Sequence, residues 1–236
     1  MPATYVLVHG AWHGGWCWQR VVDRLTAAGA RVYAPSLTGL ADRAHLLSAS
    51  VGLHTHVADI VNLMQWEELE ELVLVGHSYG GMVCGGVLAA QAPRLKALVL
   101  VDAFVPEHGK CLLDIGGPAA RQRFESLRYE TPAGPCLPPV PARMFRVNEA
   151  DADWVDRQCT PQPFRSFTDV LEMPGGVDDA VRTRVYLRAA AYPQPVFEAA
   201  SQALPARGWQ VHALPHGHDL MLDAPDAVAA HLLDLS

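Results

Sequence analysis

The chain has 236 residues, of which half are hydrophobic and 18% are charged, and its formal net charge is −7. This length suits one domain with a sizeable core, and the low charged fraction excludes an intrinsically disordered chain. An acidic chain without a long run of Lys or Arg is not expected to bind nucleic acid or an anionic membrane surface.

Short runs rich in Val, Leu and Tyr alternate with amphipathic stretches, which is the pattern of a parallel sheet covered by helices. The predicted strands cover residues 5–8, 31–34, 72–75, 97–101, 184–187 and 210–213. The predicted helices cover residues 15–28, 55–64, 79–92, 195–204 and 225–235. We therefore expect an α/β protein with a mostly parallel sheet of about six strands and helices on both faces.

The alternation of strands and helices stops between about residues 104 and 182. This part is rich in Pro and Gly, with Gly-Gly-Pro at 116–118 and Pro-Gly-Gly at 174–176, and it is too long for an ordinary loop. We predict a partly helical cap, inserted in a single domain that spans residues 1–236. In an open α/β sheet such a cap lies over the edge where ligands bind.

The strongest chemical signal is Gly-His-Ser-Tyr-Gly at 76–80, between a predicted strand and a predicted helix. This is the setting of a nucleophile elbow, a sharp turn that holds the serine hydroxyl clear of the sheet. The N-terminus of the following helix also favours negative charge. The pattern therefore predicts Ser78 as the nucleophile of an acyl-transfer reaction.

A second turn, His-Gly-Ala-Trp-His-Gly-Gly at 9–15, follows the first predicted strand. The backbone N–H groups of Ala11 and of Tyr79, the residue after the nucleophile, are the natural donors of an oxyanion hole. His9 and His13 are expected to hold this turn by hydrogen bonds.

Four histidines lie downstream of Ser78 and are candidates for the base: His212, His216, His218 and His231. His218 lies in the loop after the last strand, where its side chain can reach the edge of the sheet, and we predict it as the base. His212 lies within a strand and His231 on a helix. Because no third ligand stands at a recognisable spacing from His216 and His218, no metal site is predicted, and no cofactor is needed.

Together, the sequence at 6–16, the elbow with Gly-Met at 81–82, and Gly-His-Asp at 217–219 with Pro225 resemble the α/β-hydrolase superfamily. The similarity is closer to its small branch of carboxylesterases, plant methylesterases and hydroxynitrile lyases. It covers most of the chain outside the cap and implies the α/β-hydrolase fold. Hydroxynitrile lyases of this branch carry a threonine at the position of Gly10 and a lysine at that of Asp219. The resemblance therefore implies an esterase rather than a lyase.

The acid of the expected triad departs from the pattern of the branch. Its plant members carry the aspartate after the penultimate strand, but residues 188–195 here contain no carboxylate. Asp102, which follows the strand at 97–101, resembles the acid position of other superfamily members such as some haloalkane dehalogenases and lipases, and we predict it as the acid. Glu198 is the second choice. Asp219 adjoins His218 and is poorly placed to bond its ring.

These residues predict a serine hydrolase that cleaves an uncharged, largely apolar carboxylic ester of a small molecule through an acyl-enzyme on Ser78. Trp12, Phe104 and Phe164 are expected to line its substrate pocket. Further cap aromatics are expected there as well: Phe124, Phe145, Trp154 and Phe167. Two alternatives use the same residues, a lyase or lactone-forming or lactone-opening enzyme, and a ligand-binding module whose triad has decayed.

The cysteines and the N-terminus indicate the cellular setting. The five cysteines are widely spaced without a C-x-x-C pair, so neither a disulfide framework nor a zinc site is expected. The chain begins as a strand rather than as a signal peptide, and no apolar run reaches the roughly 20 residues of a membrane span. We expect a cytoplasmic monomer or homodimer.

Overall fold

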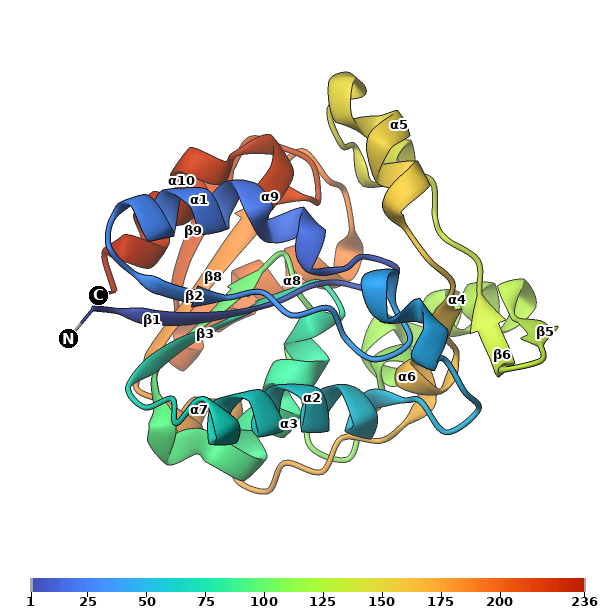
Figure 1. The fold of residues 1–236 in the computed structure, drawn as a ribbon, viewed down its shortest axis with the longest axis horizontal. Helices are drawn as coiled ribbons and strands as arrows, with labels where there is room; N and C mark the ends of the chain where they lie inside the picture. Colours follow the sequence, from blue (N-terminus) through green and yellow to red (C-terminus); the bar gives the residue numbers. More distant parts are fainter. Residues whose placement is uncertain (1, 236) are drawn as a thin grey trace.

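The computed structural model describes residues 2–235 and contains a six-stranded sheet in the order β2-β1-β3-β4-β8-β9 (Figure 1). All its neighbouring strands are parallel. The strands are β1 (Thr4–Val8), β2 (Arg31–Tyr33), β3 (Leu72–His77), β4 (Leu95–Val101), β8 (Thr183–Ala189) and β9 (Gln210–Leu214). Every predicted strand is present, and the predicted α/β fold is confirmed.

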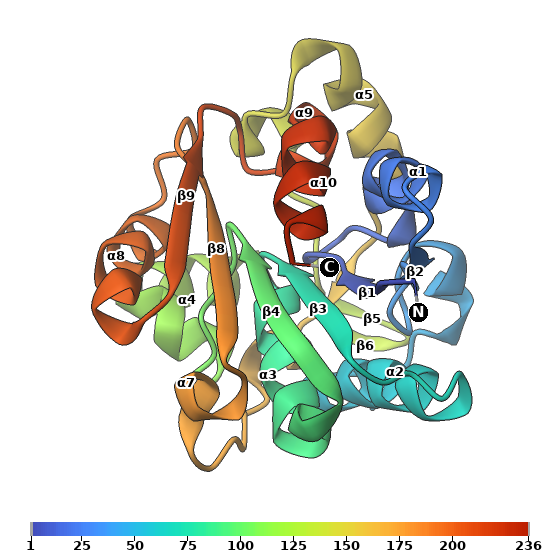
Figure 2. The same ribbon diagram turned by 90° about the vertical axis from the view of Figure 1, so that its left-hand side faces the viewer.

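Helices cover both faces of the sheet. The helices outside the expected cap are α1 (Gln19–Ala27), α2 (Leu53–Trp66), α3 (Gly80–Gln91), α8 (Pro195–Ala203), α9 (Leu220–Asp223) and α10 (Pro225–Leu233). In Figures 1 and 2, α1 and α10 pack together on one face while α2 and α3 pack together on the other. The helix predicted from residue 15 begins instead as a 3₁₀ turn, Gly15–Trp18, because the Cys17 N–H donates to Gly14 O at 3.2 Å.

The segment between β4 and β8, expected as a cap, mostly lies beyond the carboxyl ends of β1 and β3 (Figure 1). Its helices are α4 (Leu112–Leu127), α5 (Glu149–Gln158), α6 (Arg165–Thr168) and α7 (Gly176–Ala180). It also holds an antiparallel sheet of β5 (Tyr129–Thr131), β6 (Gly134–Leu137) and β7 (Gln162–Pro163). The predicted elements did not include this sheet, because strands this short that contain proline show no alternating pattern.

The core lies on both faces of the parallel sheet. Every residue of β3 is buried, and β4 is buried except at Lys96, so these central strands read as continuous apolar runs. Within residues 2–235 no helix combines the length and the apolar content that a membrane-spanning segment needs.

Helices α2 and α3 approach closely because Gly86 of α3 has no side chain. A Cβ at this position would lie 2.3 Å from a methyl carbon of Val57 on α2. We predict that Gly86→Ala lowers the free energy of unfolding by about 1–3 kcal/mol, the usual cost of overpacking. In a Val57→Ala background the same change should cost less than half as much, because the clashing methyl groups are gone. Urea unfolding of the wild type, the two single variants and the double variant measures this, and equal costs in both backgrounds would contradict it.

Candidate active site

Ser78 lies in the turn between β3 and α3 with φ of 51°, in the left-handed region. The turn is tight because it is flanked by glycines. A Cβ on Gly76 would lie 2.8 Å from Gly80 O, and a Cβ on Gly80 would lie 2.7 Å from Val8 O. This is the strained backbone that the sequence pattern predicts for a nucleophile elbow.

The turn that follows β1 runs directly beside Ser78. A Cβ on Gly10 would lie 3.0 Å from Ser78 Cβ. Within residues 2–235 the N–H groups of Ala11 and Tyr79 have no hydrogen-bond acceptor, and both residues line the same pocket as Ser78. Two free backbone donors therefore lie beside the hydroxyl, as an oxyanion hole requires.

The segment between β4 and β8 fixes this turn at Trp12, whose φ is 65°. The Trp12 N–H donates to Gln162 Oε1 at 2.9 Å, and the Trp12 carbonyl accepts from the Thr160 N–H at 2.9 Å. Gln162 is buried and donates through Nε2 to Ser166 Oγ at 2.7 Å. Sequence reasoning did not single out Gln162, since one glutamine in a Pro-rich stretch carries no signal.

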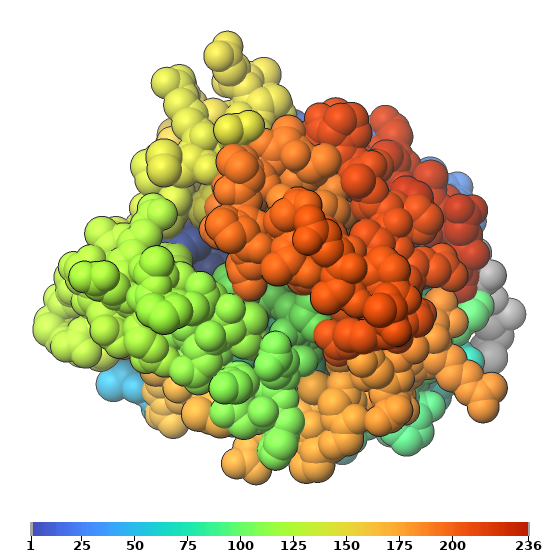
Figure 3. Space-filling view, turned by 180° about the vertical axis from the view of Figure 1, so that it is seen from behind, coloured from blue at the N-terminus to red at the C-terminus, as the bar shows by residue number. Residues whose placement is uncertain are grey.

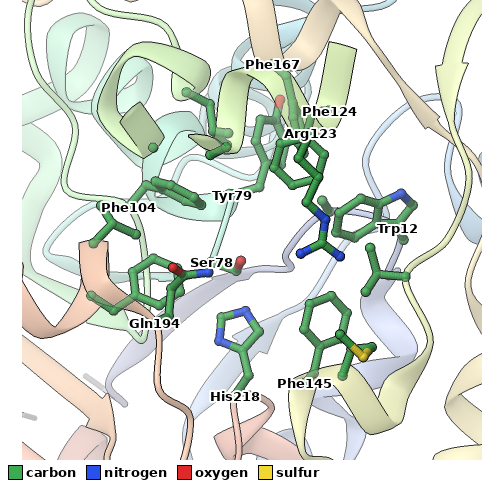
Figure 4. Close-up of a pocket in the computed structure, with 18 of the residues that line it drawn as sticks. Trp12, Ser78, Tyr79, Phe104, Arg123, Phe124, Phe145, Phe167, Gln194 and His218 are labelled. Carbon is green, nitrogen blue, oxygen red and sulfur yellow. The ribbon is translucent and has the colours of Figure 1, made fainter. Parts of the chain in front are cut away.

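His218 and Asp102 lie together at the carboxyl edge of the sheet. The Nδ1 of His218 donates to Asp102 Oδ2 at 2.7 Å, and both side chains are buried. Asp102 follows β4 with φ of 42°, and its N–H donates to Leu187 O at 2.7 Å. Nε2 of His218 has no protein partner in the described part of the chain, and in Figure 4 His218 and Ser78 are neighbours in the pocket.

The other oxygen of Asp102 is bound by strand β8, which sequence reasoning missed. Oδ1 accepts from Arg188 Nη1 at 2.7 Å and from the Ala189 N–H at 3.1 Å. Glu198, the second choice for the acid, is exposed and lies 3.7 Å from Arg188 Nη2 rather than at His218. The only signal for Arg188 in the sequence was its charge, since it stands near the end of an otherwise apolar strand.

A second buried histidine–aspartate pair links the turn after β1 to the loop that carries His218. Nδ1 of His13 donates to Ala11 O at 2.8 Å, and its Nε2 lies 2.9 Å from Asp219 Oδ2. Burial opposes both charges, but their mutual attraction and hydrogen bond raise the pKa of His13 and lower the pKa of Asp219. The pair is therefore ionic, and it ties the turn after β1 to the residue after His218.

His77 completes this cluster. It is buried, and burial together with the nearby His218 ring holds its pKa well below the ordinary value, so it stays neutral. In residues 2–235 only His77, His218 and Asp219 bring three metal-binding side chains together, with ligand atoms within 4.8 Å. His218 Nδ1 bonds Asp102, Asp219 Oδ2 bonds His13, and His77 Nε2 lies 3.2 Å from His218 O, while His77 Nδ1 and Asp219 Oδ1 have no hydrogen-bond partner in the described residues.

The pocket above Ser78 is lined mainly by apolar side chains from both parts of the fold (Figure 4). It lies where the surface is hollowed between the light green segment that contains α4 and the orange segment before α8 (Figure 3). Trp12 and Phe104 line it, as the sequence predicts. Three of the cap aromatics also line it: Phe124, Phe145 and Phe167.

Two aromatics that were predicted for the pocket lie outside it. Phe164 precedes α6 with its N–H bonded to Pro135 O, and its ring lies under the guanidinium of Arg128 at 5.5 Å. Phe167, about one helical turn later, faces the pocket instead. Trp154 packs edge-on against Trp16 at 5.0 Å between ring centroids. The short helices of this segment have too few residues for their apolar faces to be assigned from sequence.

Two further buried histidines support the site in their neutral forms. His9 accepts from the Leu37 N–H through Nε2 and bonds Gly10 O through Nδ1. His56 bonds Thr38 O through Nε2, so its Nδ1 accepts from the Tyr79 hydroxyl at 2.7 Å. Burial lowers the pKa of His9 to about 3 and that of His56 to about 4.

Comparisons with known proteins show what the chain is similar to in sequence and fold. Residues 5–231 match the model of the "Alpha/beta hydrolase family". The chain is 40% identical to a carbendazim hydrolyzing esterase of Nocardioides sp. (strain SG-4G), over 99% of each chain. An extracellular alpha/beta-hydrolase from a Paenibacillus species superposes with a TM-score of 0.86 at 23% identity, covering 100% of this chain and 99% of that one. A methylesterase from Arabidopsis gives 0.75 at 23% identity, over 98% of each chain.

The neutral histidines predict a loss of stability in acid. Between pH 6.5 and 4 the unfolded chain binds protons that folded His9 and His56 do not, so the free energy of unfolding falls as the pH falls. Each group contributes a slope of up to about 1.4 kcal/mol per pH unit. His56→Gln removes the contribution of one histidine to the slope. The glutamine amide can still accept from the Tyr79 hydroxyl and donate to Thr38 O. Urea unfolding across this pH range measures it, and an unchanged slope in the variant would contradict it.

The close approach of the turn to Ser78 predicts that Gly10→Ala impairs catalysis. The added Cβ would lie 2.8 Å from His77 Nδ1 as well as 3.0 Å from Ser78 Cβ, so the turn must shift. Because loss of one oxyanion donor costs about 10²–10³ in rate, kcat on p-nitrophenyl acetate should fall by about 100-fold. Gly29→Ala is the control: its new Cβ has no neighbour within 4 Å, and although φ of 85° strains an alanine there and lowers stability, kcat should stay unchanged. Equal kcat in both variants would refute this expectation.

Proposed function

The chain belongs to the alpha/beta hydrolase family as a carboxylic ester hydrolase, and from this premise we propose that it is a serine esterase acting through an acyl-enzyme on Ser78. The observation that carries the proposal is the arrangement around this serine. A strained hydroxyl between β3 and α3 shares one pocket with His218, whose Nδ1 is held by Asp102. This is the relation of nucleophile, base and acid that acyl transfer needs.

In the first half of the reaction, His218 Nε2 takes the proton of Ser78 Oγ as this oxygen attacks the ester carbonyl carbon. The carbonyl oxygen becomes negative and accepts hydrogen bonds from the N–H groups of Ala11 and Tyr79. The tetrahedral intermediate then collapses and the bond to the alcohol oxygen breaks. The leaving alcohol takes the proton from His218, and the acyl group stays on Ser78.

In the second half, His218 takes a proton from water, whose oxygen attacks the acyl carbon. The bond between Ser78 and the acyl group breaks, Ser78 recovers its proton from His218, and the carboxylic acid leaves. Throughout, Asp102 fixes the proton of the imidazole on Nδ1 and stabilises the imidazolium that forms twice per turnover.

The pocket favours a substrate with an apolar body. Apart from the titratable His218, the charged side chain that lines it in the described structure is Arg123, an exposed residue whose guanidinium reaches into the pocket in Figure 4. The remaining lining comes mainly from aromatic and aliphatic side chains, and we propose an uncharged, largely apolar ester as the substrate. Because the similar Nocardioides protein is named for carbendazim, that compound is one to test.

The same residues weigh against the two alternatives. The idea of a decayed triad rests on the missing carboxylate after β8, and the bond from His218 to Asp102 removes that reason. A cyanohydrin lyase of this branch carries a lysine at position 219, where this chain has a buried aspartate paired with His13. Nothing at the site specifically favours lactone chemistry.

We predict that a panel of p-nitrophenyl esters with acyl chains of increasing length, together with carbendazim, reveals Ser78-dependent hydrolysis. Ser78→Ala should lose all activity above background, and a fluorophosphonate should label the wild type but not this variant. Asp102→Asn should lose about 10⁴ in kcat, since the imidazole then adopts the wrong tautomer. Glu198→Gln is the matched carboxylate control and should keep its rate. Hydrolysis that survives in Ser78→Ala would refute the acyl-enzyme.

A further inference from the structure

Arg188 is an unusual residue to find beside a triad acid. It lies in β8 with only 4% of its side chain exposed, and β8 pairs with β4 so that Arg188 approaches the residue that follows β4. A buried guanidinium is costly unless its charge and its N–H groups are satisfied. Its Nε has no hydrogen-bond partner in the described residues, whereas both terminal nitrogens are bonded, and their partners show what the side chain holds in place.

Two partners of Arg188 belong to the site. Nη1 donates to Asp102 Oδ1 at 2.7 Å, while Oδ2 of the same carboxylate accepts from His218. Nη2 donates to Tyr192 O at 2.6 Å, in the loop between β8 and α8. Tyr192 lines the pocket, and its ring centroid lies 4.7 Å from that of His218. The Arg188 side chain therefore hydrogen-bonds both Asp102 and the loop whose Tyr192 packs on His218.

We propose that Arg188 is a positioning residue of the reaction. Its planar fork fixes the rotamer of Asp102, and through Asp102 it fixes the ring of His218 facing Ser78. This role rests on the proposed esterase function. It adds a fourth residue, from the neighbouring strand, to the expected set of nucleophile, base and acid.

The positive charge of Arg188 has a second effect, which is separate from the positioning of Asp102 and His218. Asp102 stabilises the imidazolium form of His218, and the guanidinium on the far side of the carboxylate offsets part of that attraction. Removing the charge while keeping a hydrogen-bond donor therefore favours the protonated base. The acid limb of the pH profile of kcat/KM must then move to higher pH, because only neutral His218 accepts the proton of Ser78.

Other titratable groups near Arg188, Asp102 and His218 include His77, Tyr192, Asp219 and Glu198. His77 and Tyr192 pack on the His218 ring, and Asp219 follows it in sequence and is paired with His13. On the other side, Glu198 of α8 lies 3.7 Å from Arg188 and is exposed. Burial keeps His77 neutral and raises the pKa of Tyr192, so neither carries a charge near neutral pH. Arg188 is thus the cation in contact with Asp102.

The test compares Arg188→Gln, which keeps an N–H donor but loses the charge, with Arg188→Lys, which keeps the charge but loses the fork. The control is Arg184→Gln. Arg184 lies four residues earlier on the same face of β8, its side chain is 12% exposed, and it binds Asp178 away from the pocket. All variants are assayed on p-nitrophenyl esters from pH 4 to 9, and their folding is followed by thermal unfolding.

Arg188→Gln should lose about 10- to 100-fold in kcat, less than the loss from a misplaced acid, with a smaller change in KM. The acid limb of its kcat/KM profile should move up by about 0.5–1 pH unit. Arg188→Lys should lose kcat but keep the acid limb of the wild type, which separates geometry from charge even if the Gln variant is unstable. Arg184→Gln should lose stability only.

Wild-type kcat in Arg188→Gln or Arg188→Lys would overturn the positioning role. A loss of kcat with an unshifted acid limb in the Gln variant, matched by Arg184→Gln at equal stability, would show that Arg188 acts only through folding. Failure of the wild type itself to hydrolyse any ester would count against the proposed function instead, so the two failures are distinguishable.

Discussion

The buried negative charge of Asp102 constrains this whole edge of the sheet. A carboxylate without exposure to water must be fully hydrogen-bonded, and here every partner has a position fixed by the fold. His218 binds one oxygen, while Arg188 and the Ala189 N–H bind the other. The parallel pairing of β4 with β8 makes this possible, because it brings the ends of both strands to the same edge. The orientation of His218 is therefore a consequence of sheet topology.

The second buried carboxylate, Asp219, acts on the other side of the site through one oxygen, Oδ2, while its Oδ1 has no hydrogen-bond partner in the described residues. Its partner His13 also bonds Ala11 O, so one ion pair ties the turn after β1 to the loop that carries His218. Trp12, Ser78 and Asp102 all have positive φ, and each is held there by bonds or glycine contacts from other elements. The strain is tolerated because the surrounding structure over-determines it.

Local patterns predicted the parts of the molecule that depend on local structure. The six strands, the elbow at Ser78 and the choice of His218 follow from periodicity, turn chemistry and chain order, whereas Asp102 was chosen by its resemblance to the acid position of other superfamily members. The structure brings these residues together. The hydrogen-bonded pairs that support these residues could not be predicted, because each pair joins positions far apart in the sequence. Asp102 and Arg188 are 86 residues apart, and Trp12 and Gln162 are 150 apart. A single sequence without a three-dimensional register cannot pair such residues. Phe164 was misassigned for another reason, because the helix that follows it has too few residues to show which face is apolar.

The location of the acid explains why a cation stands in β8. The ends of β4 and β8 meet at one edge, so a carboxylate on either strand can reach the imidazole, and the resemblance to plant methylesterases had pointed to the loop after β8. With the acid after β4, a further carboxylate at the end of β8 would repel it inside a dry site. Arg188 is instead a cation, and it compensates the negative charge of Asp102. His13 compensates the negative charge of Asp219 in the same way. Each buried carboxylate thus has its own cation, and under the proposed function His218 is the group that gains and loses a proton at Ser78.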